Sequence, residues 1–256
     1  MRARSIVLLV AAMLPLAACS RGDNNQLQGW VEADMLFISP DEAGRVETLS
    51  VREGDKVDKA APVFSVDDDL QKADQVVRQA AVINAQQTFE RAKQLVQTAA
   101  GTQKNYDDAE AALRQANANL SAAQTRLTRR RVFSPAAGTI QQVYFRVGET
   151  VPAGRGVVAL LPPENLKVRF FAPQATLPNI RIGETIGVSC DGCDAGLTAK
   201  VSFIALSAEY TPPVIYSLEE RAKLVFLIEA RPDRPEKFRV GQPLSVTLPM
   251  PQGPAK

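Results

Sequence analysis

Apolar and polar residues alternate between glycines in two matching segments of the chain, residues 39–63 and 134–158. A period of two predicts short, half-buried strands joined by tight turns. One copy alone is too small to enclose a core, so the two copies are expected to pack against each other. The matched positions are Gly44, Val46, Leu49, Val51, Gly54, Asp55 and Val57 in the first copy, and Gly138, Ile140, Val143, Phe145, Gly148, Glu149 and Val151 in the second.

Between the copies, residues 70–130 are rich in Ala, Gln, Arg and Glu and contain no proline, which predicts helix throughout. Gly101 lies near the midpoint, so we expect two arms that fold back on each other, each reaching roughly 40 Å. The returning arm has a coiled-coil spacing of four and three, and the outgoing arm is less regular. The expected contact residues are Ala109, Leu113, Ala116, Leu120, Ala123 and Leu127 on the returning arm, and Ala85, Phe89, Ala92, Val96 and Ala99 on the outgoing arm.

Short alternating runs then follow from residue 166 to residue 250, separated by Pro, Gly and Asp clusters. This spacing predicts a small antiparallel β-barrel. Pro212 and Pro213 cannot lie in a central strand, so they are expected in a loop that enters a strand at Lys223. Residues 251–256 form a polar tail. The fold class is therefore mixed α and β, elongated and multidomain.

The two half-motifs resemble the halves of the biotinyl/lipoyl domain. Split by a helical hairpin, they resemble the HlyD-type membrane fusion family of periplasmic adaptors, and the resemblance covers nearly the whole mature chain. It implies a lipoyl-like β-sandwich of residues 29–69 and 131–165, a coiled-coil hairpin of residues 70–130, and a β-barrel of residues 166–250. Residues 208–230 are similar to the barrel of one subgroup.

A carrier role is the alternative that the lipoyl-like fold suggests. Carrier domains present a modified lysine on the tight turn that joins the two halves. Here about 60 residues of predicted helix replace that turn, and the nearest lysine, Lys72, lies inside the helix. The sequence therefore argues against a carrier.

The amino terminus combines two arginines, an apolar run and small residues, which predicts a signal peptide over residues 1–18. Residues 16–19, Leu-Ala-Ala-Cys, resemble a bacterial lipobox, so Cys19 is expected to be lipidated, with residues 19–28 as a tether. Several acyl chains on one residue would anchor the protein stably, because a single chain is marginal. The alternative is ordinary signal cleavage, with Cys19 incidental.

Cys190 and Cys193 are then the remaining cysteines, and a pair in an exported protein favours a disulfide. Asp191 and Gly192 between them predict a two-residue hairpin turn, with Cα atoms about 5.5 Å apart across it. Redox or metal roles are the alternatives, but a zinc site would need further ligands and the chain has no histidine.

Charge and motifs narrow the class of function further. Removing residues 1–18 takes away two of the 30 basic residues and none of the 28 acidic ones, so the mature chain is formally neutral and nucleic acid is not an expected partner. Residues 129–131 place arginines at a helix end, and residues 67–69 place aspartates at a helix start, where metal binding is the weaker alternative. Without a nucleotide loop or hydrolase motif, we expect neither enzymatic activity nor a cofactor.

Arg91, Leu95 and Thr102 lie around the predicted reversal. Their spacing is similar to the pattern RxxxLxxxxxxS of adaptors that engage TolC-like outer-membrane channels, with threonine in place of serine. Arg91 and Leu95 are one turn apart, and Thr102 can cap the returning helix. The resemblance implies that these residues contact the channel; the alternative is that Arg91 is a solvated helix residue and Leu95 an ordinary residue of the contact between the two arms.

The resemblance implies a periplasmic adaptor of a tripartite export system, in a ring of six subunits that links an inner-membrane transporter to an outer-membrane channel. Neither chain end is long enough for the membrane-proximal domain typical of adaptors of resistance-nodulation-division (RND) pumps, which favours an ABC-type transporter. Adaptors of MFS or RND transporters and a stand-alone envelope-ligand-binding lipoprotein are the alternatives. The expected location is the periplasm, anchored to the inner membrane, although Ser20 does not favour inner-membrane retention by the rule of enteric bacteria.

Overall fold

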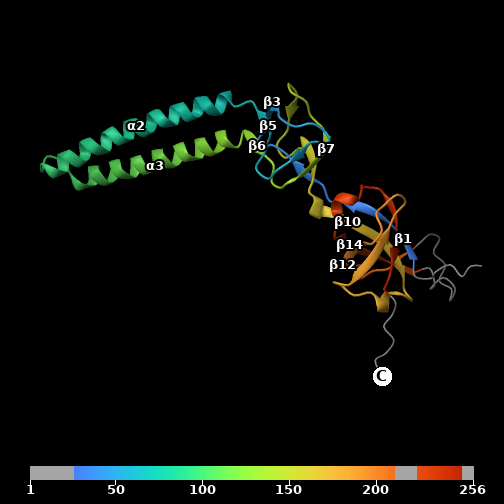
Figure 1. The fold of residues 1–256 in the computed structure, drawn as a ribbon. Helices are drawn as coiled ribbons and strands as arrows, with labels where there is room; N and C mark the ends of the chain where they lie inside the picture. The colour runs from blue at the N-terminus through green and yellow to red at the C-terminus, as the bar shows by residue number, and fades with distance from the viewer. Residues whose placement is uncertain (1–25, 211–223, 250–256) are drawn as a thin grey trace, which may run out of the picture. The chain divides into compact units, whose positions relative to one another are not determined.

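The computed structural model describes residues 26–210 and 224–249 (Figure 1). The described residues divide into two compact units, residues 33–165 and residues 26–32 with the described part of residues 166–249, and each is described by itself. The expected signal peptide, the lipidated Cys19, the loop with Pro212 and Pro213, and the tail lie outside the described residues. No helix within the described ranges combines the length and the apolar composition that spanning a membrane requires.

The first unit contains a β-sandwich built from both sequence copies. One sheet has the strand order β2-β9-β7-β4 and the other has β6-β5-β3-β8. Each sheet mixes the two halves, since β4 pairs with β7 and β8 pairs with β3. The strands are β2 (Leu36–Ile38), β3 (Gly44–Leu49), β4 (Lys56–Val57), β5 (Pro62–Val66), β6 (Arg131–Phe133), β7 (Gly138–Val143), β8 (Thr150–Val151) and β9 (Val158–Leu161).

The core of this sandwich comes from equivalent positions of the two copies. Val46 and its counterpart Ile140 are both buried, as are Val63 and Val158. The expectation that two small half-motifs enclose a shared core is confirmed, because neither half alone holds enough apolar surface.

The helical hairpin leaves the sandwich after β5 and returns before β6 (Figure 1). Helix α2 spans Asp69–Gln97 and helix α3 spans Gln103–Thr128. The chain reverses at Gly101, where the backbone N–H groups of Ala100 and Gly101 both donate to the carbonyl oxygen of Leu95, at 2.8 and 2.9 Å. Thr102 caps α3, because its side chain accepts from the N–H of Asn105 at 3.2 Å. The predicted reversal and cap are confirmed.

The contact surface between α2 and α3, here called the seam, alternates at spacings of three and four in both helices. The outgoing arm is geometrically regular, but its first seam positions are polar, which explains its weaker apolar pattern. The prediction that Ala99 contacts the returning arm is wrong, because Ala99 is exposed, lies after α2 and has a positive φ of 55°. The seam consists of Gln71, Gln75, Arg78, Val82, Ala85, Phe89, Ala92 and Val96 in α2, and Tyr106, Ala109, Leu113, Ala116, Leu120, Ala123 and Leu127 in α3.

The second unit is a closed antiparallel β-barrel of six strands in the order β10-β1-β15-β11-β12-β14, with β14 returning to β10. The short strand β13 (Glu209–Tyr210) pairs with β14 outside the ring. The barrel strands are β1 (Gln26–Ala33), β10 (Leu166–Pro173), β11 (Thr185–Ser189), β12 (Leu197–Ile204), β14 (Leu224–Pro232) and β15 (Pro243–Thr247).

Strand β1 differs from the sequence expectation, which assigned residues 26–28 to a tether and residues 29–32 to the lipoyl-like half. Instead β1 pairs with β15, near the other end of the chain. Gly29 suits this position, since a Cβ there would lie 2.6 Å from the carbonyl oxygen of Arg169. The alternation of β1 predicts a strand but contains no information about its distant partner.

A four-residue turn with the pattern Arg-x-Gly-acid (or amide) occurs in both units. In each case the side-chain oxygen of the last residue accepts from the N–H of the arginine, at 2.8 to 3.0 Å, and the glycine has a positive φ between 80° and 95°. Only glycine adopts this conformation freely. The turns are residues 52–55 and 146–149 in the sandwich, and residues 181–184 and 239–242 in the barrel.

Candidate functional site

The tip of the hairpin has an open depression of about 360 Å³ lined by Arg91, Gln94, Leu95 and Thr98. These residues lie within two turns of one another on one face of the end of α2, with Thr98 as its C-cap. That face points away from the seam, which runs through Ala92 and Val96. Leu95 is 49% exposed, so it is not a seam residue. Of the residues predicted at the tip, the structure brings Arg91 and Leu95 together in this depression.

Polar contacts order the same face. The guanidinium of Arg91 donates to Thr88 Oγ1 at 3.1 Å, and Thr98 Oγ1 donates to the carbonyl oxygen of Gln94 at 3.1 Å. Thr98 was missed by the sequence reasoning, although its spacing of seven from Arg91 places it on the same side of the helix.

Thr102 does not line the depression; it begins the returning helix. Gly101, which directly precedes Thr102, packs closely against Leu95, since a Cβ at Gly101 would lie 2.9 Å from the Cβ of Leu95. Behind this contact, the rings of Phe89 and Tyr106 pack across the seam with their centroids 5.3 Å apart. The tip therefore presents the apolar side chain of Leu95 beside the cation of Arg91, on a helix end that these packing contacts hold in place.

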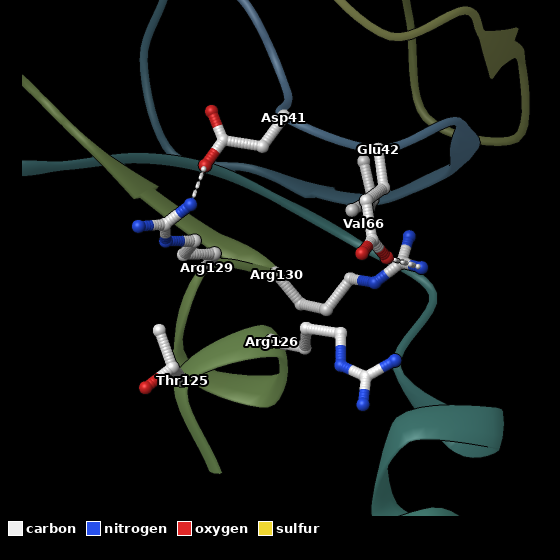
Figure 2. Close-up of a pocket in the computed structure, with 7 residues that line it drawn as sticks. All are labelled: Asp41, Glu42, Val66, Thr125, Arg126, Arg129 and Arg130. Carbon is white, nitrogen blue, oxygen red and sulfur yellow. Dashed lines mark hydrogen bonds and ion pairs between the residues drawn. The ribbon is translucent and has the colours of Figure 1, made fainter. Parts of the chain in front are cut away.

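At the other end of the hairpin, arginines join α3 to the sandwich (Figure 2). The side chain of Arg130 is only 9% exposed, and it donates to Glu42 Oε2 at 2.8 Å and to the carbonyl oxygen of Ala43 at 3.0 Å. Arg129 pairs with Asp41 at 3.3 Å. A pocket of about 220 Å³ lies between these groups, lined by Asp41, Glu42, Val66, Thr125, Arg126, Arg129 and Arg130.

This arrangement corrects the simple reading of the arginine run as cations at a helix end. Helix α3 ends at Thr128, Arg129 and Arg130 contact the segment before β3, and Arg131 already belongs to β6. Gly44 permits this close approach, since a Cβ there would lie 2.9 Å from the Nη1 of Arg130. The base of the hairpin is thus a charged, partly buried joint.

The aspartates at the start of α2 also have local partners. Asp67 pairs with Arg45 at 3.2 Å and accepts from the N–H of Asp69. Asp68 pairs with Lys72 at 2.5 Å, and this contact raises the pKa of Lys72. Local ion pairs therefore account for Asp67 and Asp68 at the helix start.

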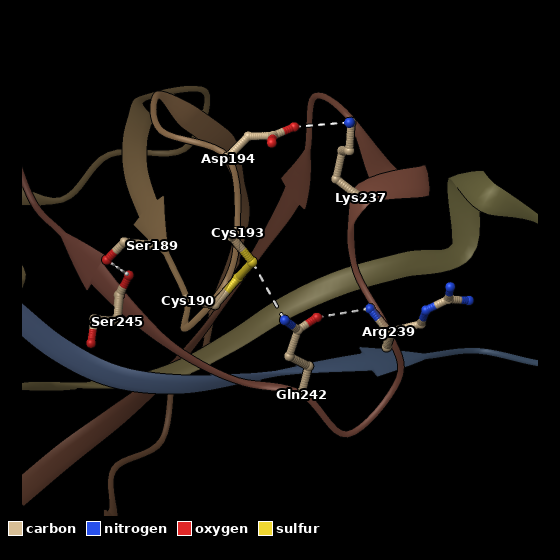
Figure 3. The surroundings of a disulfide bond; sticks show 8 residues. All are labelled: Ser189, Cys190, Cys193, Asp194, Lys237, Arg239, Gln242 and Ser245. Atoms are coloured by element: carbon tan, nitrogen blue, oxygen red, sulfur yellow. Dashed lines mark hydrogen bonds and ion pairs between the residues drawn. A yellow bond between two sulfur atoms is a disulfide. The ribbon is translucent and has the colours of Figure 1, made fainter.

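In the barrel, Cys190 and Cys193 are joined by a disulfide, with Cα atoms 5.3 Å apart (Figure 3). The prediction of a two-residue hairpin is wrong. The last paired residues of β11 and β12 are Val188 and Leu197, and the cysteines lie in the longer loop between them. A second turn, ending at Gly196, lengthens this loop; the Asp-Gly signal predicts the first turn but not the second.

The disulfide loop contacts the segment that precedes β15. Gln242 Nε2 donates to Cys193 Sγ at 3.4 Å, and Lys237 pairs with Asp194 at 2.8 Å (Figure 3). The Lys237 ammonium lowers the pKa of Asp194. The disulfide therefore braces two loops at one end of the barrel.

Comparison with known proteins agrees with this architecture. Residues 68–131 match the family model "RND MFP, alpha-helical hairpin domain", so the hairpin is similar to the hairpin domain of membrane fusion proteins. The membrane fusion protein Spr0693 of Streptococcus pneumoniae has a similar structure, with a TM-score of 0.68 and 21% identity over 87% of this chain and 98% of that one. A chimera of MacA that contains the α-hairpin domain of Pseudomonas aeruginosa MexA has a TM-score of 0.67 and 20% identity, over 87% of this chain and 79% of that one.

Two curated relatives match by sequence. A UPF0194 membrane protein from the asrC 5′ region of Acidithiobacillus ferridurans is 29% identical over 135 residues, which is 52% of this chain and 40% of the relative. An uncharacterized Haemophilus influenzae protein is 26% identical over 155 residues, 60% of this chain and 41% of the relative. The matched part of the chain thus spans about two fifths of the length of these relatives.

Proposed function

We propose that this protein is a non-catalytic periplasmic adaptor, a membrane fusion protein of HlyD type, in a tripartite export system. The observation that carries the proposal is the tip of the hairpin, where the half-exposed Leu95 lies beside Arg91 on a face turned away from the seam. An exposed apolar side chain beside a cation at the far end of a long hairpin is suited to docking on another protein. A TolC-like outer-membrane channel is the proposed partner at this end, with Thr102 supporting the contact through the start of α3.

The hairpin itself supports this role. Helices of 29 and 26 residues extend about 40 Å at 1.5 Å per residue, so the tip is presented far from the sandwich. The buried Arg130 and its partners hold the base of the hairpin. A rigid spacer with a specific end is what a connector between two membranes requires.

For the inner membrane, we propose an ABC-type exporter as the transporter and lipidation of Cys19 as the anchor, as the sequence suggests. Adaptors of MFS transporters are an alternative. An RND pump is the other, and the name of the hairpin's family model favours it. We further propose a ring of six subunits, as the resemblance to the adaptor family implies.

The test is photo-crosslinking in intact cells, with a photoreactive residue in place of Leu95, followed by purification of the complex. Ile83 is a matched control, because it is 52% exposed on the same helix but far from the tip. We expect the Leu95 probe to capture an outer-membrane channel and the Ile83 probe not to capture it. The transporter that copurifies identifies the inner-membrane partner, and capture of no channel from position 95 would contradict the docking proposal.

A further inference from the structure

The two ends of the barrel differ in what they expose. One end, here called the entry end, contains the start of β1 at Gln26, the start of β11 and the end of β12, as the strand pairings require. The opposite end contains the disulfide loop and the start of β15. The segment that precedes β1 therefore joins the barrel at the entry end.

Three apolar side chains project from loops and strand ends at the entry end. Ile182 is 70% exposed, Phe203 is 47% exposed and Leu206 is fully exposed. Ile182 is the second residue of the Arg-x-Gly-acid turn 181–184, and Gly183 N–H donates to the carbonyl oxygen of Val201 at 2.8 Å, which sets Ile182 beside the end of β12. Leu206 follows Ala205, whose N–H donates to the carbonyl oxygen of Leu227. Backbone hydrogen bonds thus fix two of these side chains where they face solvent.

The length of chain before the barrel limits where this end can lie. From Cys19 to Gln26 there are seven peptide links, which span at most about 25 Å when fully extended. If Cys19 carries the lipid, as the proposed function has it, the entry end lies within that distance of the bilayer. The exposed apolar side chains are then within reach of the membrane surface.

We propose that the entry end of the barrel rests on the phospholipid bilayer, with Ile182, Phe203 and Leu206 inserted at the level of the headgroups. Apolar side chains that project from a turn and from the end of a strand suit shallow insertion, because each can enter the interface without a complementary groove. The anchor raises the local concentration of lipid at this end, so a few side chains suffice for contact. The inference rests on the proposed anchor and adds a second, non-covalent contact with the membrane.

The test places a tryptophan at the entry end. Leu206→Trp is made in a Trp30→Phe background, since Trp30 is the only native tryptophan. The chain from Cys19 onward, which retains every described residue, is coupled through the Cys19 thiol to maleimide lipid in vesicles of phosphatidylethanolamine and phosphatidylglycerol. This coupling makes the experiment independent of native lipidation and of the outer-membrane channel.

Val240 provides a control at the opposite end of the barrel. It is exposed and is the second residue of turn 239–242, the position that Ile182 has in turn 181–184. We expect nitroxide-labelled lipid to quench Leu206→Trp at least threefold more than Val240→Trp, with a blue shift for Leu206→Trp alone. Adding Ile182→Asp to Leu206→Trp should restore solvent-like emission, whereas adding Val240→Asp should not. Circular dichroism checks the fold of each variant.

Equal quenching at both positions would overturn the proposal. So would protection of position 206 only when the membrane contains the transporter, because the surface would then be a protein docking site. Either result leaves the adaptor function standing, since that is tested by crosslinking at the tip.

Discussion

Arg130 shows how one residue joins a helix to a sheet domain. Its side chain is almost wholly buried, yet it has a carboxylate and a carbonyl oxygen as acceptors. Burying an arginine is costly unless its donors are satisfied. The neighbouring Arg129 makes a similar ion pair in solvent, with 64% of its side chain exposed, so the two arginines differ in burial rather than in chemistry.

Replacing Arg130 should therefore destabilise the protein more than replacing Arg129. We expect Arg130→Met to lower the free energy of unfolding by about 1–3 kcal/mol, since it removes hydrogen bonds that involve a buried charge. Arg129→Met should cost less than about 1 kcal/mol, as for exposed ion pairs. Urea titration followed by circular dichroism measures both, and equal losses would show that burial of Arg130 is not what matters.

Leu95 is the residue on which the tip proposal depends. Leu95→Asp should abolish or strongly reduce export, because it places a charge in an apolar contact. Ile83→Asp, an equally exposed change on the same helix, should leave export near wild type. Efflux assays in cells, with protein levels checked by immunoblot, make the comparison. Wild-type export by stable Leu95→Asp protein would contradict docking through this residue.

At the scale of elements, local patterns were predictable and distant pairings were not. The seam of α3 and the cap at Thr102 follow from spacing and residue type within a few turns of helix. The partner of β1 could not be predicted, because alternation does not specify which distant strand supplies the hydrogen bonds. The half-exposed position of Leu95 was also open in the sequence, since leucine is equally common in a seam, and the structure decides it.

The disulfide loop is an element whose stabilising effect we expect to be modest. Cys190 and Cys193 close a very short loop, so the entropic gain is small, about 1–2 kcal/mol. The double change Cys190→Ala and Cys193→Ala should lower the free energy of unfolding of the barrel by this amount, which is measured as a lower urea midpoint. Alkylation of non-reduced protein taken from the periplasm tests the bond itself, and two reactive thiols there would contradict it.

Lowering the pH should loosen the same loop at its ion pair. Because Lys237 lowers the pKa of Asp194, the contact is fully present above the ordinary pKa of an aspartate and is lost as the pH falls through the lowered value. Asp194→Asn should remove this acid-dependent change. Amide exchange of residues 190–196 between pH 5 and pH 2 reports it, and an identical acid response in Asp194→Asn would assign the effect to another group.

At the scale of the whole molecule, the division into two units separates two tasks. The unit of residues 33–165 contains the hairpin and its joint, and the other unit contains the barrel, whose entry end receives the chain from residue 25. The split of the lipoyl-like fold by a hairpin was predictable because the two copies share their glycines and apolar positions. The barrel boundary at residue 26 was not, since it depends on closure by strands from both ends of the sequence.

The anchor is tested on the whole molecule. Replacing Cys19 with alanine should release the protein into the soluble periplasmic fraction and abolish labelling by a fatty-acid probe, because the apolar contacts at the entry end are too few to retain it alone. Fractionation and metabolic labelling measure the two effects. Labelling that persists in the variant would assign lipidation to another residue, or to none.

The pairing of β1 with β15 also sets an order of folding. The hydrogen bond between Gln28 and Ser245 joins residues 217 positions apart, and the whole sandwich and hairpin lie between them in the chain. Residues 33–165 are continuous in the chain and can fold by themselves, whereas the barrel cannot close until its last strand is present. Until then β1 lacks its partner β15 and has an unpaired backbone edge. While the barrel is incomplete, this strand edge is therefore the part of the fold most open to wrong pairing.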